Sequence, residues 1–438
     1  MLRRHLVVSV LLFAAAHALH AQTVHAQPAP IPIRALAAPD ARSTALLTAP
    51  FGVRELAGGR VIVNDAGARR LLLLDAALAS VTVLADTTAG APTAYGPRGT
   101  GIIAYPGDST LFVDIMSRAF ALLAPDGKTA RTMAAPRTGD VAWLANTSYG
   151  TPGIDPNGRL VYRAFPAFRG DAVDTASFSN MPLDSAPIIR ADFDTRRADT
   201  VALLGVPRPQ MSRQRQADGR TVLQLRVHPL PLIDDWALLP DGTIAVLRGH
   251  DYHLDWISAN GTRTSTPKMP FDWRRLSPEE KQTIVDSTKR AIDSTWTVAQ
   301  RPSPTGGSPA TAGTRVVGSA MNRTGDDNTD APRPVAAPSP APEVVSAAAL
   351  PDHIPPVLRA GTMRVDPMGR VWILPSTSAH AAGGYLYDVV DTRGTIVERV
   401  RSPAGRTLVG FGARGTVYLT ARDSAGLHLE RTRLPDSR

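Results

Sequence analysis

The chain contains no cysteine among its 438 residues. Its fold therefore cannot depend on disulfides, and it cannot carry the lipid that bacterial lipoproteins attach to a cysteine. Stability must come from a hydrophobic core, which a chain of this length can supply. Long apolar runs are also missing beyond the N-terminus, so we expect no membrane-spanning helix in the folded protein.

The N-terminus has the pattern of a secretory signal peptide. A basic start, Met1–His5, precedes the apolar run Leu6–Ala16, which is too short to span a bilayer. We expect residues 1–26 to be the signal peptide and residues 27–438 to be a periplasmic or secreted protein. An uncleaved membrane anchor is the alternative. Small residues allow cleavage after Ala18, Ala21 or Ala26.

Clusters of positive charge are missing, although the net charge is +9. The basic residues stand singly along the chain without interleaved aromatics, which argues against nucleic acid as a partner. Catalytic fingerprints are missing as well, since no G-x-S-x-G nucleophile turn, Walker loop or dinucleotide-binding loop is present. The expected partner is a small molecule, a glycan or an envelope protein, with no membrane insertion after signal cleavage.

What the chain does have is one turn repeated six times. In each copy, a tight polar turn with a glycine joins an apolar segment to a short alternating apolar strand, which is typical of a β-hairpin. Third strands and second turns follow several copies, as in AFALLAPDGK and YLYDVVDTRGT. The six glycines are Gly59, Gly107, Gly158, Gly242, Gly369 and Gly415.

Four antiparallel strands repeated radially form a β-propeller blade, so six copies predict an all-β, six-bladed β-propeller. A pair of β-sandwiches, which also has short strands and turns, is the alternative. The last copy, Leu408–Leu434, has only three strands. We expect Ile31–Leu36 to supply the fourth strand and close the ring, because its prolines suit an edge strand.

Two blades carry a further pattern. Asp65 follows the second strand of its blade and Arg70 opens the third, and Asp114 and Arg118 echo them one blade later. This arrangement resembles the NHL repeat, and the chain resembles the NHL-like and TolB-like bacterial six-bladed propellers. The resemblance implies that such an aspartate pairs with the nearby arginine and holds a loop. It also implies a binding scaffold more often than an enzyme.

Three insertions are expected to share one face of the propeller. The tight turns of a blade lie on one face, and the remaining loops lie on the other. Ala164–Ala186, Pro207–Ile233 and residues 271–356 all belong to the second kind, so we expect this insertion-bearing face to bind the ligand. The second insertion contains a predicted hairpin, QADGRTVLQLRV.

The third insertion begins with a predicted helix over residues 277–298. Ser277 and Glu280 form a capping box, with Pro278 at the first helical position. The apolar face of this helix either packs on the propeller rim or serves as a lid or partner surface. Residues 301–349 are rich in small and polar residues and proline, so we expect a disordered linker there.

The fourth blade has the densest group of polar residues. Carboxylates and imidazoles can ligate zinc or a related metal, which makes Asp235, His250 and His253 candidate metal ligands. Hydrogen bonds that hold the loop are the alternative use of these side chains. The group consists of Asp234 and Asp235 at the start of the first strand, and Arg248, His250, Asp251 and His253 around the next loop.

Arginines recur toward the same face, at positions 54, 98, 163, 248 and 359. Converging guanidinium groups could bind a carboxylate, a phosphate or an acidic sugar. Arg163, Arg248 and Arg359 therefore join the polar residues of the fourth blade as candidate ligand-binding residues, and no catalytic residue is predicted.

These observations favour an exported, non-catalytic binding or scaffold protein that needs no cofactor. The alternative is a divalent-metal-dependent hydrolase of the gluconolactonase type, which would use Asp234, Asp235, His250 and His253. Propeller lactonases hold calcium with carboxylates and amides from several inner strands, and here only the fourth blade places carboxylates at the start of its inner strand.

Overall fold

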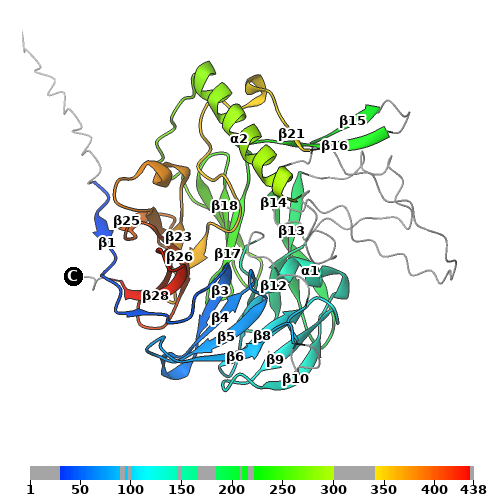
Figure 1. Cartoon of the computed structure of the whole chain (residues 1–438), viewed down its shortest axis with the longest axis vertical. Coiled ribbons are helices and arrows are strands. Elements are labelled where there is room, and N and C mark those ends of the chain that lie inside the picture. Colours follow the sequence, from blue (N-terminus) through cyan, green and yellow to red (C-terminus); the bar gives the residue numbers. More distant parts are fainter. Residues whose placement is uncertain are drawn as a thin grey trace, which may run out of the picture. The chain divides into compact units, whose positions relative to one another are not determined.

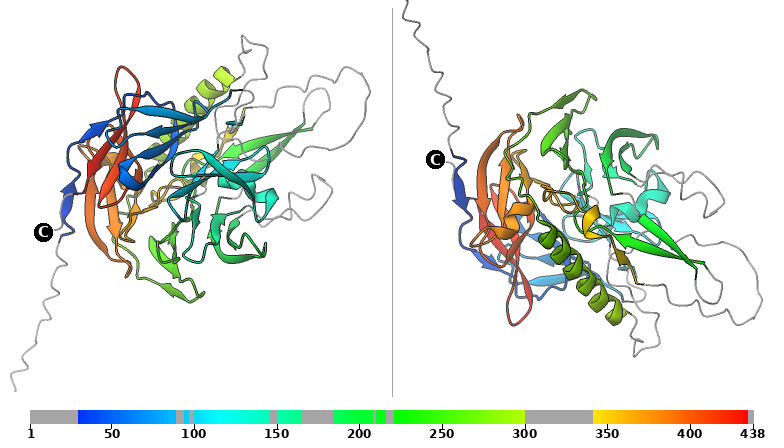
Figure 2. Two further views of the ribbon diagram at one scale, coloured as in Figure 1. Left: turned by 90° about the horizontal axis from the view of Figure 1, so that it is seen from below. Right: turned by 90° about the horizontal axis from the view of Figure 1, so that it is seen from above.

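Short apolar strands separated by glycine turns pair in the structure as antiparallel sheets arranged around a common axis (Figure 1, Figure 2). The computed structural model describes residues 30–88, 94–96, 100–145, 150–164, 184–207, 210–215, 221–299 and 341–434. Within the unit Pro32–Arg438, six sheets form the predicted six-bladed β-propeller, in place of two β-sandwiches. The predicted signal peptide, residues 1–26, lies outside the described residues.

Each of the first four blades is a run of four strands consecutive within its sheet. Blade one consists of β3 (Pro50–Glu55), β4 (Val61–Asp65), β5 (Arg70–Leu74) and β6 (Val81–Ala85). Blade two consists of β7 (Ile102–Tyr105), β8 (Ser109–Asp114), β9 (Ala119–Leu123) and β10 (Thr129–Ala134). Blade three consists of β11 (Gly153–Ile154), β12 (Leu160–Arg163), β13 (Ser185–Ala191) and β14 (Ala198–Gly205). Blade four consists of β17 (Asp235–Leu238), β18 (Ile244–Arg248), β19 (His253–Ile257) and β20 (Arg263–Ser265).

The last two blades also include strands from the N-terminal segment. Blade five consists of β22 (Arg364–Val365), β23 (Val371–Ile373), β24 (Leu386–Val390) and β25 (Ile396–Arg401), with β1 (Ile33–Ala35) as a fifth strand. Blade six consists of β26 (Arg406–Phe411), β27 (Thr416–Arg422), β28 (Leu427–Arg433) and β2 (Ala41–Arg42).

The turn between the first and second strands of a blade, here called the inner turn, explains the recurring glycine. All six predicted glycines adopt left-handed backbone conformations, with φ between 70° and 84°. Residues with a Cβ rarely adopt this conformation, whereas glycine does so at little steric cost. The six hairpins could therefore be recognised from the sequence.

The N-terminal segment closes the ring, but not with the residues predicted. The fourth strand of blade six is β2, which pairs antiparallel to β28. The predicted closing segment, Ile31–Leu36, instead contains β1, which pairs parallel to β25 of blade five. Arg34 forms an ion pair of 3.1 Å with Glu398 there. The prolines correctly indicated an edge strand, but they could not identify which blade it extends.

The hydrophobic core lies between neighbouring blades. Successive residues of a strand point to opposite faces, so each blade offers an apolar face to each neighbour. Val161 and Ile188 of blade three, for example, pack with Trp236 and Ile244 of blade four. Comparable clusters join blade one to blade two and blade five to blade six. The blades are thereby fixed relative to one another, and this fixes the positions of their first strands.

Segments of the second and third insertions build a small cap with its own core (Figure 1). β15 (Gln210–Arg215) and β16 (Thr221–Val227) form the predicted hairpin, and β21 (Glu343–Val344) pairs parallel to β16. The predicted linker, residues 301–349, is wrong for its last part, because 341–349 contain β21 and the 3-10 turn η4 (Ala347–Ala349). Val344 and Val345 are buried there, which a disordered segment would not achieve. Residues 301–340 lie outside the described residues.

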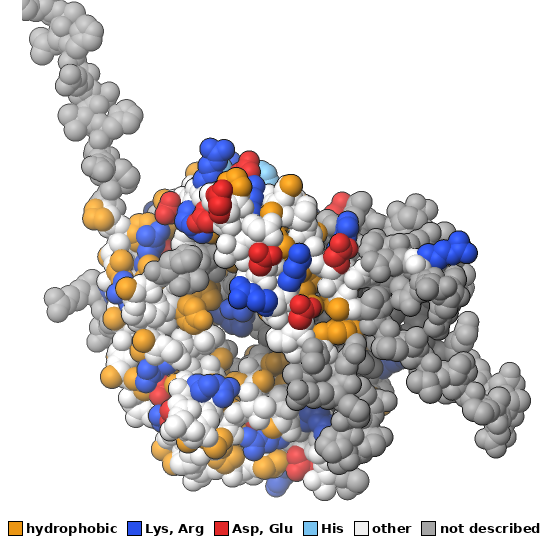
Figure 3. Space-filling view, turned by 45° about the horizontal axis from the view of Figure 1, so that its top comes forward, with side chains coloured by type: hydrophobic (Ala, Val, Ile, Leu, Met, Phe, Trp, Pro, Cys, Tyr) orange, Lys and Arg blue, Asp and Glu red, His pale blue; other side chains and the backbone are white. Residues whose placement is uncertain are grey.

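The helix of the third insertion, α2 (Pro278–Ala299), begins as predicted. The Ser277 N–H donates to Oε2 of Glu280 at 2.9 Å, and the Glu280 N–H donates to Oγ of Ser277 at 3.2 Å. The apolar face packs into the cap, where Val285 is buried against Val344 and Leu350, rather than on the propeller rim. Acidic and basic side chains are interspersed over this side of the molecule (Figure 3).

The remaining short elements are η1 (Ala57–Gly59), η2 (Thr138–Asp140), α1 (Val141–Leu144) and η5 (Ser376–His380). None of the helices in the described part of the chain is long and apolar enough to cross a membrane.

Candidate functional site

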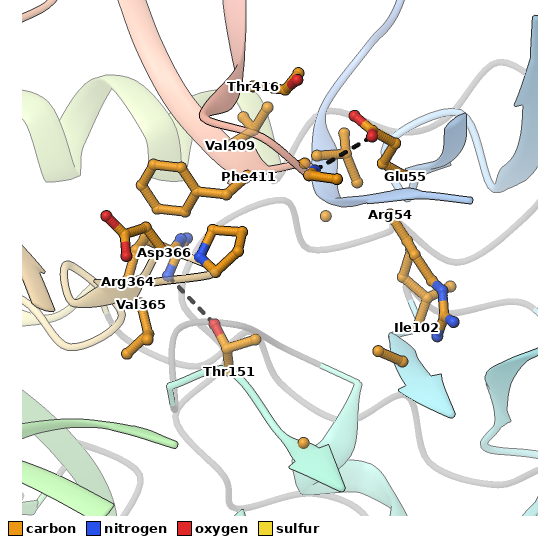
Figure 4. Close-up of a pocket in the computed structure, with 18 of the residues that line it drawn as sticks. Arg54, Glu55, Ile102, Thr151, Arg364, Val365, Asp366, Val409, Phe411 and Thr416 are labelled. Atoms are coloured by element: carbon orange, nitrogen blue, oxygen red, sulfur yellow. Dashed lines mark hydrogen bonds between the residues drawn. The ribbon is translucent and has the colours of Figure 1, made fainter. Parts of the chain in front are cut away.

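The first strands of all six blades line one pocket on the propeller axis (Figure 4). Its volume is about 1200 Å³, which is ample for a small-molecule ligand. The lining extends from the first strands to residues of the inner turns, including Gly58, Asp108, Pro240, Pro367 and Arg414. The pocket therefore reaches toward the face opposite the insertions, whereas the sequence directed attention to the insertion-bearing face.

The size of the pocket follows from one recurring position on the first strands. In five blades, the same backbone hydrogen bond closes the inner turn, from the N–H of one residue to the carbonyl four residues later. The residue two places before that N–H lines the axis in each case. These residues are Arg54, Gly153, Ala237, Arg364 and Gly410. Three of the five are small and leave the axis open, while two are arginines.

Arg54, in β3, brings a positive charge into the pocket wall beside blade two (Figure 4). Its Nη2 donates to the Tyr105 carbonyl oxygen at 3.2 Å and lies 3.9 Å from Oδ1 of Asp108. Its Nε and Nη1 are buried and hydrogen-bond to no described residue. Burial lowers the pKa of this guanidinium, and the Asp108 carboxylate opposes that effect. The charge of Arg54 is therefore only partly compensated.

Arg364, in β22, occupies the equivalent position in blade five. Its Nη1 donates to the carbonyl oxygens of Gly361 at 2.8 Å and Met363 at 3.1 Å. The same nitrogen reaches Oγ1 of Thr151, in the segment just before β11, at 3.4 Å (Figure 4). Burial is the main influence on this guanidinium and lowers its pKa. Among the described residues, all hydrogen bonds of Arg364 use Nη1.

The three acidic residues of the pocket differ in how far their oxygens are occupied. Glu55 accepts hydrogen bonds from the Tyr418 hydroxyl at 2.7 Å and the Ala413 N–H at 3.2 Å. Asp366 accepts hydrogen bonds from Nε of Arg370 and Nε1 of Trp372. These bonds hold the inner turn of blade five. By contrast, Oδ2 of Asp108 accepts from the Ala57 N–H at 2.8 Å, while its Oδ1 accepts no hydrogen bond from a described residue.

Asp235, a predicted ligand-binding and metal-binding residue, lies fully buried away from this pocket. Its carboxylate accepts hydrogen bonds from the backbone N–H groups of Trp236, Gly361, Thr362 and Met363, and from the Thr362 hydroxyl. Burial raises the pKa of this carboxyl, and the hydrogen bonds act against that rise. In this structure, Asp235 ties blade four to the segment that leads into blade five.

Asp234 and Arg248 hold each other and the adjacent loop. Nη1 of Arg248 lies 2.6 Å from Oδ2 of Asp234, and Nε of Arg248 lies 2.7 Å from Oδ2 of Asp255. The N–H groups of Gly205 and Gly249 also donate to Asp234. Asp234 and Arg248 therefore hold the loop by hydrogen bonds, which is the alternative role expected for these side chains.

The predicted histidines lie at the surface of blade four. The side chain of His250 is 82% exposed. His253 is more buried, with Nδ1 3.6 Å from Asp251 and Nε2 3.4 Å from Asp255. Lys268 contacts the other oxygen of Asp251 at 3.3 Å. Desolvation acts to raise the pKa of that carboxyl, but Lys268 and the two histidines together lower it. The structure brings His250, Asp251 and His253 together, but Asp235 does not join them in a metal-binding group.

The remaining predicted arginines do not line the axial pocket. Arg163 ends β12 and is half-buried, and Arg359 is exposed in the segment before β22. Arg98 lies outside the described residues. Of the arginines named from the sequence, only Arg54 lies in the pocket wall. Arg364 was missed, because its position on the axis is visible only when the inner turns of blades one and five are aligned.

The pairing implied by the NHL-like pattern forms in blade one. Nε of Arg70 donates to Oδ2 of Asp65 at 3.0 Å, and Oδ1 of Asp65 accepts from two backbone N–H groups. In blade two, Asp114 instead accepts hydrogen bonds from Met116 and Ser117. A second signal was overlooked in the sequence. In the motif D-P-x-G-R of blades three and five, the aspartate pairs with the arginine across the inner turn.

A calcium ion takes six to eight oxygen ligands, and the axial pocket does not offer a comparable set. Both oxygens of Glu55 and of Asp366 are engaged by protein donors. Asn64, the pocket amide, donates to the Thr100 carbonyl and accepts from the Tyr95 hydroxyl. In the described part of the chain, no group of three or more His, Asp or Glu side chains could hold a metal ion. These residues therefore do not fit a resident metal.

No protein-family model matches the chain, and no curated protein matches it. Solved structures resemble it over nearly its whole length. A gluconolactonase from Xanthomonas campestris is 13% identical, with a TM-score of 0.41, and the match covers 93% of this chain and 99% of that one. Regucalcin, a calcium-binding protein from Agrobacterium tumefaciens, is 11% identical, with a TM-score of 0.39 and coverages of 93% and 98%. Virginiamycin B lyase from Staphylococcus aureus is 10% identical, with a TM-score of 0.38 and coverages of 90% and 98%.

At these identities, the likeness concerns the fold. It is consistent with the NHL-like and TolB-like resemblance but does not single out that family. The expectation of a non-catalytic binding scaffold is wrong against this comparison, which favours the alternative, because gluconolactonase and virginiamycin B lyase are named as enzymes. This chain is thus a six-bladed β-propeller similar in fold to gluconolactonase-type proteins.

Proposed function

We propose that this chain is a hydrolase that opens lactone or ester bonds of small molecules in the axial pocket. The bond class is the one suggested by the gluconolactonase named above. The observation that carries the proposal is Oδ1 of Asp108, which accepts no hydrogen bond from a described residue and faces Arg54 on the pocket wall. The other two pocket carboxylates are engaged by donors and are less suited to accept a proton.

Ester hydrolysis requires a base for the attacking water and a positive group near the oxygen that becomes negative. Oδ1 of Asp108 can take a proton from water as the water oxygen bonds to the carbonyl carbon. The Arg54 guanidinium, with Nη2 3.9 Å from that Oδ1, can stabilise the negative charge on the carbonyl oxygen. The carbon–oxygen bond of the lactone then breaks, and its oxygen takes the proton. The product is a hydroxy acid.

This proposal retains the hydrolase activity that the sequence analysis gave as the alternative, but it places the reaction in the axial pocket and not at the polar residues of blade four. Asp234, Asp235 and His250 do not line the pocket, and the pocket carboxylates do not form a metal-binding set. The chemistry above therefore uses only the chain's own residues. Hydrolysis that persists with a chelator would support this assignment.

The test is hydrolysis of a panel of sugar lactones and simple aryl esters by the purified full chain, followed with a pH indicator or by release of the aryl alcohol. Asp108→Asn keeps the shape of the side chain and removes the base, so kcat should fall by about 100-fold or more. Asp241→Asn is the matched control, because Asp241 lies exposed on an inner turn but does not line the pocket.

Circular dichroism and thermal unfolding would show that both variants are folded. Each assay is run with calcium and with a chelator. Equal kcat for Asp108→Asn and wild type would overturn the role of Asp108. Loss of activity with chelator, restored by calcium, would overturn the metal-independent chemistry. No turnover of any lactone or ester would overturn the proposed function itself.

A further inference from the structure

The two arginines Arg54 and Arg364 on the axis meet little negative charge. Several other partly buried arginines sit directly against carboxylates. Arg190 lies 3.4 Å from Asp155, Arg370 lies 2.8 Å from Asp366, and Arg406 lies 2.6 Å from Glu430. Arg54 has one carboxylate at 3.9 Å without a hydrogen bond to it. Arg364 is influenced by the charge of Asp235 but forms no ion pair with a described residue, and its side-chain hydrogen bonds go to carbonyl and hydroxyl oxygens.

From this contrast we infer that the axial pocket binds a substrate that carries a carboxylate group, which pairs with Arg364 and is attracted by the positive charge of Arg54 on the same pocket wall. This inference rests on the proposed function, since it names the substrate class of the same pocket. A buried cation whose charge is only partly compensated is unfavourable, and an anionic ligand supplies further negative charge. Burial lowers the pKa of both guanidinium groups, because removal from water disfavours their charged form.

Arg364 also has the geometry for a carboxylate. Three acceptors, on Gly361, Met363 and Thr151, fix its Nη1. Its Nε and Nη2 form no hydrogen bond with a described residue, and neither is among the fully enclosed, unpartnered nitrogens. These two nitrogens form one edge of the guanidinium plane, and two parallel N–H groups match the two oxygens of a carboxylate.

The surroundings leave room for such a ligand. Arg364 and Arg54 belong to blades five and one, and the first strand of blade six lies between them in the ring. Its residue at the equivalent position is Gly410, which has no side chain to occupy the pocket. Ala237, on the other side of Arg364, is equally small. Among the five equivalent first-strand residues, the two with long polar side chains are Arg54 and Arg364, which project from separate parts of the ring (Figure 4).

Direct binding tests this inference without requiring turnover. The probes are D-glucuronate and D-glucose, which differ in charge through a single carboxylate, with inorganic phosphate as a second anion. Isothermal titration with the full chain should show binding of glucuronate and none of glucose. In Arg364→Gln, the Kd for glucuronate should rise at least tenfold, and Arg54→Gln should weaken it in the same direction. Arg393→Gln is the matched control, because Arg393 is 83% exposed and lies outside the pocket.

Arg364→Lys keeps the charge but loses the paired N–H edge, so it too should weaken glucuronate binding. If Arg364→Gln does not fold, Arg364→Lys is measured in its place. Equal affinity for glucuronate and glucose would overturn the inference, as would unchanged binding in the folded Arg364 variants. Tighter binding of phosphate than of any carboxylate would overturn the assignment of the anion.

A pair of substrates separates the inference from the proposed function. Glucarolactone carries a free carboxylate where gluconolactone carries a neutral hydroxymethyl group. We expect the larger kcat/KM for glucarolactone, with the preference lost in Arg364→Gln. Hydrolysis without this preference would refute the inference alone. Carboxylate binding without hydrolysis of either lactone would refute the proposed function and leave the carboxylate site in place.

Discussion

Replacement of Asp235 by alanine tests whether this residue holds the fold or belongs to a reactive centre. Its carboxylate is 0% exposed and accepts five hydrogen bonds, four of them from backbone N–H groups. Alanine would leave those four N–H groups buried without an acceptor. A buried donor without a partner costs about 1–3 kcal/mol, and relaxation or entry of water recovers part of that. We therefore expect the free energy of unfolding to fall by about 3–5 kcal/mol.

The assay is urea-induced unfolding followed by tryptophan fluorescence, since Trp236 is adjacent to the substitution. Asp235→Asn is a second variant, in which an amide N–H₂ group meets the same donors, and it should also be clearly destabilised. Asp241→Ala is the control, because Asp241 is an exposed residue of the same blade and its loss should cost less than about 1 kcal/mol.

The structural role of Asp235 would be refuted by an Asp235→Ala protein that unfolds within 1 kcal/mol of wild type, a margin taken from the usual range of surface substitutions. If such a protein had also lost hydrolytic activity, the polar group of blade four would return as the candidate site.

Three further predictions concern backbone clearance, the cap helix and pH. Gly249→Ala would place a Cβ 1.9 Å from the Ile233 carbonyl oxygen and should destabilise the fold by at least about 2 kcal/mol in thermal unfolding, whereas Gly139→Ala meets nothing within 4 Å and should be neutral. Ser277→Ala should weaken the start of α2 by about 1 kcal/mol, seen as faster hydrogen exchange in its first turn only. Burial raises the pKa of Tyr95 from 10.0 to about 12, so its contribution to stability is present below pH 10 and is lost as the pH rises toward 12. Tyr95→Phe should flatten alkaline unfolding in that window, and an unchanged pH profile would contradict this.

The architecture could be predicted because it depends on short-range chemistry. Six glycines with left-handed backbone conformations and the capping box of Ser277 are local features, and each is present in the structure. The sequence correctly predicted that an N-terminal segment closes the ring, but it identified the wrong residues. The reason is that the pairing of β1 with β25 depends on a strand far away in the sequence. No local property of Ile31–Leu36 identifies that partner.

The candidate site was harder to predict. Histidine and aspartate types drew attention to His250 and Asp235, yet one is mostly exposed and the other is saturated by backbone donors. The pocket instead depends on which first-strand residues face the axis, and these include the glycines at positions 153 and 410. Small residues carry no functional signal in a sequence. Their meaning, and that of Arg364, appears only once the register of the blades is known.

The strands β1 and β2 have a consequence for biosynthesis. They leave the ribosome first, while the strands that receive them, β25 and β28, are made last. The ring of blades therefore stays open until β25 and β28 have been synthesised, and pairings so distant in sequence form slowly. Removal of β28 would leave β2 without its partner strand, so a chain that lacks β28 should be open and sensitive to proteases.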